Sequence, residues 1–231
     1  MLDFLGTITT AALMMVVVNA IVTFMPIGRT AKIALAGIAG IWIGFAAAAA
    51  ASGWLATFKP FPIIGLFVAA PLVAAAVATA WPAARAALLG LPTPLMIGLN
   101  IGRVFAVLFL LLEAQGRLAG PFPFFAAGGD IITGLVALRL LFVAAGGKHS
   151  AATMAWNLFG TADLVLAIFL GVSSSEGPLQ LFHSPPGSEA MQHLPWSFVP
   201  TVLVPLYLIM HATIWAQLRA RGVAPQDVGP S

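Results

Sequence analysis

Cysteine is absent from this chain of 231 residues, and charged residues make up only 7% of it. The lack of cysteine excludes disulfide bonds, zinc sites with cysteine ligands and iron–sulfur clusters. Soluble domains contain roughly 25% charged residues, so these few charges could not cover the surface of a soluble protein of this length. Because 61% of the residues are hydrophobic, the composition excludes soluble, disordered and nucleic-acid-binding proteins and indicates a polytopic membrane protein.

Long apolar segments predict an all-α membrane protein with seven transmembrane helices, each needing about 20 apolar residues to cross the hydrocarbon core. The first segment lacks the positively charged start of a signal peptide and is too long for one, so we expect it to be retained. The whole chain is then one transmembrane domain, with a short cytoplasmic tail at 219–231. The predicted spans are about 5–27, 33–58, 63–81, 95–113, 124–145, 151–173 and 195–218.

Basic residues predict the orientation, because loops rich in lysine and arginine stay on the cytoplasmic side. Seven of them fall on one side of the predicted spans, namely Arg29, Lys32, Arg85, Arg139, Lys148, Arg219 and Arg221. Only Lys59 and Arg117 fall on the other side. With seven spans, this bias places the N-terminus outside and the C-terminus in the cytoplasm of a bacterial inner membrane.

Ionisable residues within the predicted spans are the candidate functional residues, because each costs about 2.5–3.5 kcal/mol to insert near the bilayer centre. At about 1.5 Å of helix per residue, Arg103 and Asp163 come within reach of each other. We therefore expect one polar cluster, with Asp130 just above this pair and the other two members below it. The cluster comprises Arg103, Asp130, Asn157, Asp163 and His211.

Four further residues are secondary candidates, because they are spaced to lie near cluster residues on the same helices or, for Glu113, because it lies at the outer membrane boundary. They are Asn100, Glu113, Trp156 and Tyr207. No spacing of histidine and acidic residues matches a metal-binding motif, and the sequence identifies no cofactor. In the segment before Asp130, Gly120, Pro121 and Pro123 indicate either an ordinary outer loop or a short re-entrant turn that shapes a cavity mouth.

The second half of the chain, roughly 100–218, resembles an uncharacterised family of bacterial multi-spanning membrane proteins. The matching segments are RVFAVLFLLLEAQG at 103–116, GDIITGL at 129–135, WNLFGTADL at 156–164 and VPTVLVPLYLIMH at 199–211. The resemblance implies no activity, but it points to the same five polar residues.

Three functions stay open at this point. The first is binding or transport of a small solute, lipid or proton at the polar cluster, because intramembrane charges are usually functional. The second is a non-catalytic scaffold of a membrane complex, in which the cluster only joins helices. The third is a metal-dependent membrane-embedded enzyme using Asp130, Asp163 and His211. The expected partners are the bilayer, a small-molecule or lipid ligand, and a second copy or another subunit, with no nucleic acid.

Overall fold

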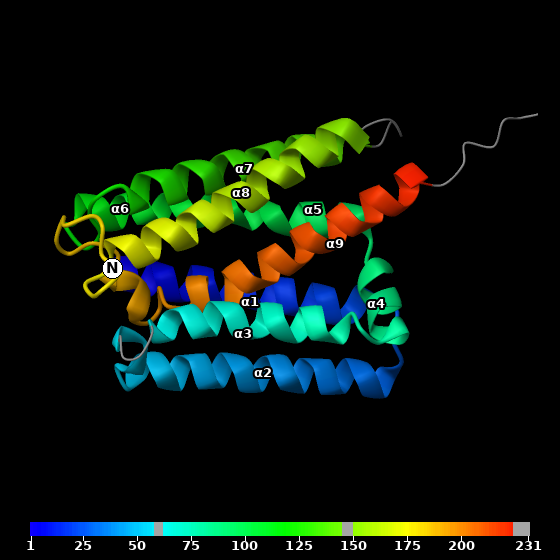
Figure 1. The fold of residues 1–231 in the computed structure, drawn as a ribbon, viewed down its shortest axis with the longest axis horizontal. Coiled ribbons are helices and arrows are strands. Elements are labelled where there is room, and N and C mark those ends of the chain that lie inside the picture. The colour runs from blue at the N-terminus through cyan, green and yellow to red at the C-terminus, as the bar shows by residue number, and fades with distance from the viewer. Residues whose placement is uncertain (58–61, 145–149, 224–231) are drawn as a thin grey trace, which may run out of the picture.

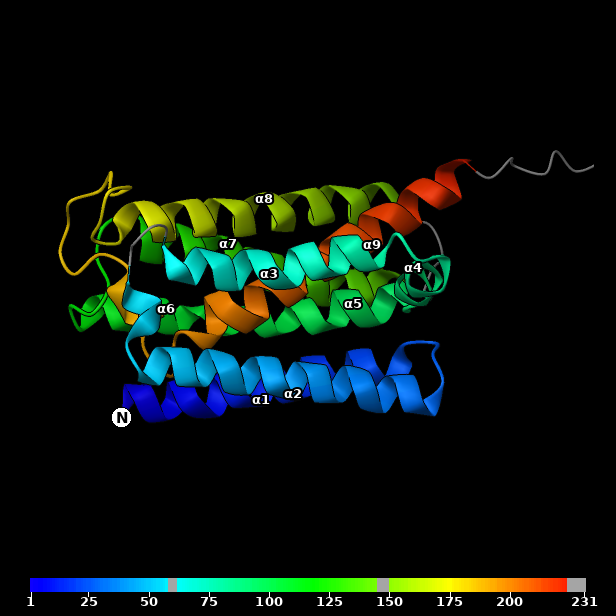
Figure 2. The same cartoon turned by 60° about the horizontal axis from the view of Figure 1, so that its bottom comes forward.

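The computed structural model describes residues 1–57, 62–144 and 150–223. Every long element in this part of the chain is a helix, and the helices run lengthwise beside one another (Figures 1 and 2). The long helices are α1 (Leu2–Phe24), α2 (Arg29–Ala51), α3 (Ile63–Ala78), α7 (Phe122–Ala144), α8 (Ser150–Ser174) and α9 (Val204–Val223). Shorter elements are η1 (Trp54–Ala56), α4 (Pro82–Leu89), α5 (Thr93–Leu99), η2 (Asn100–Ala106), α6 (Val107–Ala114), η3 (Glu189–Gln192) and η4 (Val199–Leu203).

Six segments of the described chain are long and apolar enough to cross a membrane. Two of them are composite: Thr93–Ala114 combines α5, η2 and α6, and Val199–Ala220 combines η4 with most of α9. The structure therefore supports a multi-pass membrane protein. The predicted tail at 219–231 is helical as far as Val223, and residues 224–231 lie outside the described chain.

The third predicted span, 63–81, is longer than the helix that forms there. Helix α3 ends at Ala78, and α4 begins at Pro82 with a bend of 111° between the two. A proline disfavours the helical conformation in the residue before it, and Trp81 is accordingly extended, with φ −90° and ψ 122°. Helix α3 nevertheless runs along the bundle beside α2, while α4 lies across its end (Figure 1).

The segment before Asp130 begins as an ordinary loop, which contains Gly120 and Pro121 and connects α6 to α7, and it forms no re-entrant turn. Helix α7 begins at Phe122 and continues through Gly128 and Gly129 to Ala144. The seventh span starts later than predicted, because residues 193–198 still belong to the connection and the helix begins as a π-helical turn, η4. Pro200 lies in that turn and Pro205 in the first turn of α9.

The two ends of the bundle differ in basic residues. The turn between α1 and α2, helix α4 and the end of α9 lie at one end, and the N-terminus and the turn after α6 lie at the other (Figure 1). The first group contains Arg29, Lys32, Arg85 and Arg219, whereas Arg117 follows α6. Lys59 and Lys148 lie outside the described residues. Which end faces the cytoplasm stays a prediction.

Helix α7 occupies the centre of the second half of the chain, where it contacts α5, η2, α6 and α8. The approach of η2 is close, because a Cβ on Gly134 would lie 3.0 Å from the backbone nitrogen of Val104. Gly134 is one helical turn from Asp130 and shares its face. This approach brings Arg103 on η2 against α7.

Candidate functional site: a buried arginine between two aspartates

Arg103 is the centre of the site, with only 1% of its side chain exposed. Its Nε donates to Asp130 Oδ1 at 2.5 Å, and its Nη2 donates to Asp163 Oδ2 at 2.5 Å. The two carboxylates belong to α7 and α8, so one guanidinium joins three separate segments. Charge-assisted hydrogen bonds of this kind are roughly twice as strong as neutral ones.

The remaining amino group of Arg103 faces α8 and α9. Its Nη1 lies 3.3 Å from the carbonyl oxygen of Gly160 and 3.1 Å from His211 Nε2. Because a guanidinium can only donate, Nε2 of His211 must accept. The histidine proton is then on Nδ1, which lies 2.8 Å from Asn157 Oδ1.

Asn157 fixes this arrangement with a second hydrogen bond. Its Nδ2 donates to the backbone carbonyl of His211 at 3.1 Å, while its Oδ1 accepts from the ring. The ring of Trp156 packs beside the imidazole, with centroids 5.2 Å apart, and its Nε1 donates to the carbonyl of Thr133. The imidazole is therefore held in one orientation from both sides.

Two glycines of the helices around the cluster make space for it. A Cβ on Gly129 would overlap the carboxylate of Asp163, and one on Gly160 would lie 2.6 Å from His211 Cε1. Glycine at these two positions lets α7, α8 and α9 approach closely enough for the polar atoms to meet. The GD and WNxxG patterns of the sequence contain these glycines, but nothing in them shows which side chain fills the space.

All five primary candidates thus meet in one cluster. Of the four secondary candidates, two contact the cluster and two do not. Trp156 joins it through His211, and the ring of Tyr207 lies 5.8 Å from Arg103 Cζ, within the range of a cation–π contact. Asn100 is buried but donates to Met96 O in the preceding helix α5. Glu113 lies ten residues beyond Arg103, about 15 Å along the helix, and does not join.

Two cavities meet at Asp130. The first, which we call the α1 cavity, is lined by residues of α1, η2 and α9 and reaches Arg103, Asp130 and Tyr207. The second, the α3 cavity, is lined by residues of α3, α7 and α8 and by the connection between α8 and η4. With cavity volumes of about 50 and 70 Å³, both exceed the roughly 10–15 Å³ that one water molecule needs.

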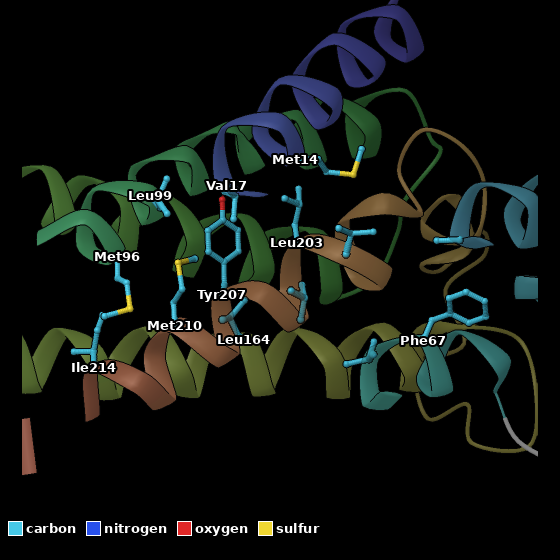
Figure 3. Close-up of a cluster of buried hydrophobic side chains, with 14 of the residues drawn as sticks. Met14, Val17, Phe67, Met96, Leu99, Leu164, Leu203, Tyr207, Met210 and Ile214 are labelled. Atoms are coloured by element: carbon cyan, nitrogen blue, oxygen red, sulfur yellow. The ribbon is translucent and has the colours of Figure 1, made fainter. Parts of the chain in front are cut away.

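The Tyr207 hydroxyl is a buried polar group at the wall of the α1 cavity. Within the described chain it has no hydrogen-bond partner, and the residue is 4% exposed. Figure 3 shows the ring beside Leu164 with its hydroxyl directed towards Val17 on α1. Since buried hydroxyls rarely lack a partner, this atom is suited to hold a water molecule in the α1 cavity.

A second group of polar contacts involves Trp196, which lines the α1 cavity, and was not predicted from the sequence. Trp196 donates from Nε1 to Asp3 Oδ1 at 2.8 Å, and Arg117 donates to the same oxygen at 2.8 Å. Gly6 accommodates the indole ring, because a Cβ there would lie 2.7 Å from it. These residues are 114 to 193 positions apart, so no local pattern could reveal the contact.

These features define a class: a multi-pass helical membrane protein with a buried arginine-centred polar cluster. Residues 60–219 match a family model described as a domain of unknown function, DUF8737, and the chain belongs to this family. No curated protein matches the chain, and no solved structure matches it either. The matched region contains the whole cluster and every residue that lines the α3 cavity, whereas α1 and α2 lie outside it.

Proposed function

We propose that this protein binds a proton at the Asp130–Asp163 pair and couples that proton to the movement of a small solute across a bacterial inner membrane. In this proposal the chain is a single domain of seven spans, with α3 as the third. The N-terminus is outside and the C-terminus is in the cytoplasm.

The observation that carries the proposal is the charge count of the cluster. Arg103 supplies one positive charge, while Asp130 and Asp163 supply two negative charges when both are ionised. The hydrogen bonds of His211 leave it neutral. An uncompensated buried charge is costly, so the cluster favours the uptake of one proton or one cation.

A proton or cation can reach the cluster only through a cavity, and Asp130 is the carboxylate that lines the cavities. Its side chain is 14% exposed, compared with 6% for Asp163, and it lines both cavities. Asp130 is therefore the carboxylate that we expect to gain and lose the proton, whereas Asp163 holds Arg103 in place.

The test is proton flux into proteoliposomes that contain the purified chain and an entrapped pH indicator. We expect an imposed pH gradient to collapse faster than in protein-free vesicles, and the excess rate to fall at least tenfold in Asp130→Asn. Glu176→Gln is the matched control, because Glu176 is an exposed carboxylate outside the cluster. Wild-type flux equal to that of empty vesicles, or undiminished flux in Asp130→Asn, overturns the proposal.

A scaffold role is the second candidate, and the closure of the hydrogen-bond network favours it. Arg103 alone joins η2 to α7, α8 and α9. In that case a stable partner subunit should co-purify with the chain, and neutralising Asp130 should change stability without changing any flux. The metal-dependent enzyme receives no comparable support, since no three metal-ligating side chains gather anywhere in the described residues.

A further inference from the structure

The two cavities at Asp130 differ in the charges that they present. The α1 cavity contains both Arg103 and Asp130, so its charges are opposed. In the α3 cavity, Asp130 is the one charged side chain among the described residues of the wall. Arg103 binds Asp130 from outside this wall, so the charge that an occupant of the α3 cavity meets directly is the carboxylate, which repels an anion and attracts a cation.

The rest of the α3 cavity is apolar along most of its length. Leu164, Ala167 and Ile168 of α8 form one wall, and Phe109 and Phe122 stack with ring centroids 6.1 Å apart on another. From Leu164 to Ser175 the cavity follows α8 for about 16 Å. With a volume of about 70 Å³, about half of the roughly 150 Å³ that holds benzene in an apolar protein cavity, the α3 cavity suits a small body with a short apolar part.

The far end of the α3 cavity contains polar groups that are already satisfied by one another. Ser188 Oγ donates to Gly171 O, the hydroxyls of Ser175 and Ser188 lie 2.7 Å apart, and Gln192 Nε2 donates to Ser175 Oγ. A ligand therefore gains little by directing a charged group to this end. Its charged group belongs at Asp130.

We propose that the α3 cavity binds a small organic monocation whose ammonium group donates to Asp130 in place of the exchangeable proton. This inference rests on the proposed function, because it makes the proton and the solute competitors for one carboxylate. Either occupant restores neutrality to a cluster with two acidic groups and one guanidinium, so binding of the cation releases the proton.

The other charged or titratable groups near Asp130 do not compete for the site at which the ammonium group replaces the proton. Arg103 on η2 and Asp163 on α8 form the ion pairs already described, and His211 and Tyr207 on α9 lie next to Arg103. On α7 itself, Arg139 is exposed and nine residues away, about 13 Å along the helix. Since the ammonium replaces a proton, its affinity should fall as the pH is lowered.

Calorimetry on the purified full-length chain in detergent tests the inference with three probes of similar shape. They are ethylammonium, the neutral ethanol and the anionic acetate, which are small enough for the α3 cavity. We expect saturable binding of the ammonium at least tenfold tighter than that of the alcohol, and no binding of the anion. Titrations in two buffers with different ionisation enthalpies should show release of up to one proton per ammonium bound.

Two variants test the contributions of the Asp130 carboxylate and of the cavity space to binding separately. Asp130→Asn should weaken ammonium binding at least tenfold and abolish proton release. Gly65→Leu should block the α3 cavity from α3, because a Cβ on Gly65 meets nothing within 4 Å, and should leave proton uptake by Asp130 intact. Equal affinity for alcohol and ammonium, or unchanged binding in both variants, overturns the inference.

The outcomes also separate this inference from the proposed function. Proton flux that depends on Asp130 without ammonium binding overturns the inference alone. If Asp130→Asn changes neither proton flux nor ammonium binding, both are overturned.

Discussion

The carboxylate of Asp163 on α8 occupies the space that a side chain at Gly129 on α7 would fill. Gly129 directly precedes Asp130, whose carboxylate binds the same arginine. Gly129 thus leaves room for the side chain of Asp163, and the next residue, Asp130, supplies the other carboxylate. The spacing of the two acidic groups around Arg103 is built into the contact between α7 and α8.

Gly129→Ala should therefore disturb the cluster although it adds only a methyl group. We expect a loss of about 1–3 kcal/mol of stability, because the methyl group must displace Asp163 or separate the helices. Thermal unfolding in detergent measures this loss. Gly128→Ala is the matched control, since a Cβ there meets nothing within 4 Å, and replacing this helical glycine should leave stability unchanged or raise it by up to about 1 kcal/mol. Equal stabilities for the two variants would contradict the packing argument.

Removing the guanidinium of Arg103 alone should lower the stability more than removing the guanidinium and both carboxylates together. Arg103→Met leaves two buried carboxylates without their partner, and breaking a buried ion pair in this way typically costs about 3–5 kcal/mol. We expect the triple variant Arg103→Met, Asp130→Asn, Asp163→Asn to be more stable than Arg103→Met alone, because it leaves no buried charge. Chemical unfolding in detergent compares the two. A triple variant less stable than the single one would show that charge compensation is not what holds the cluster.

Much of the cluster is predictable from the sequence, because the cost of burying charge requires partners. Arg103 and Asp163 were expected to meet from helix geometry alone, and they do. The direct contact of Arg103 with Asp130 was not foreseen, since it depends on how closely η2 approaches α7 at Gly134.

Other features depend on contacts between distant segments and left no signal in the sequence. The two glycines before Asp130 fall inside the predicted fifth span and lie within α7, but nothing in the sequence showed that Gly129 makes room for Asp163 of α8. The predicted third span ends at Trp81, directly before Pro82, but nothing in the sequence indicated that α3 would already end at Ala78 or that α4 would follow at a bend of 111°. The bonds from Trp196 and Arg117 to Asp3 join parts of the chain that no spacing rule relates.

The protonation of His211 provides a spectroscopic test of the network. Because Arg103 can only donate to Nε2, we expect the neutral ring with its proton on Nδ1. Nitrogen-15 NMR of the histidine-labelled protein should show a protonated Nδ1 and an unprotonated Nε2. The chain has four histidines, so His211→Gln assigns the signal by its loss. A proton on Nε2 would be incompatible with the hydrogen bond from Arg103.

The absence of cysteine makes the topology directly testable, since a single introduced cysteine is the only thiol in the protein. Gln115 and Thr30 are exposed residues, next to the turns that follow α6 and α1. If α3 is a span and the basic end is cytoplasmic, a membrane-impermeant maleimide should label Gln115→Cys in intact cells. Thr30→Cys should react only after the membrane is permeabilised. Labelling of Thr30→Cys alone in intact cells would reverse the orientation, and labelling of both from outside would show that α2 and α3 do not both cross the bilayer.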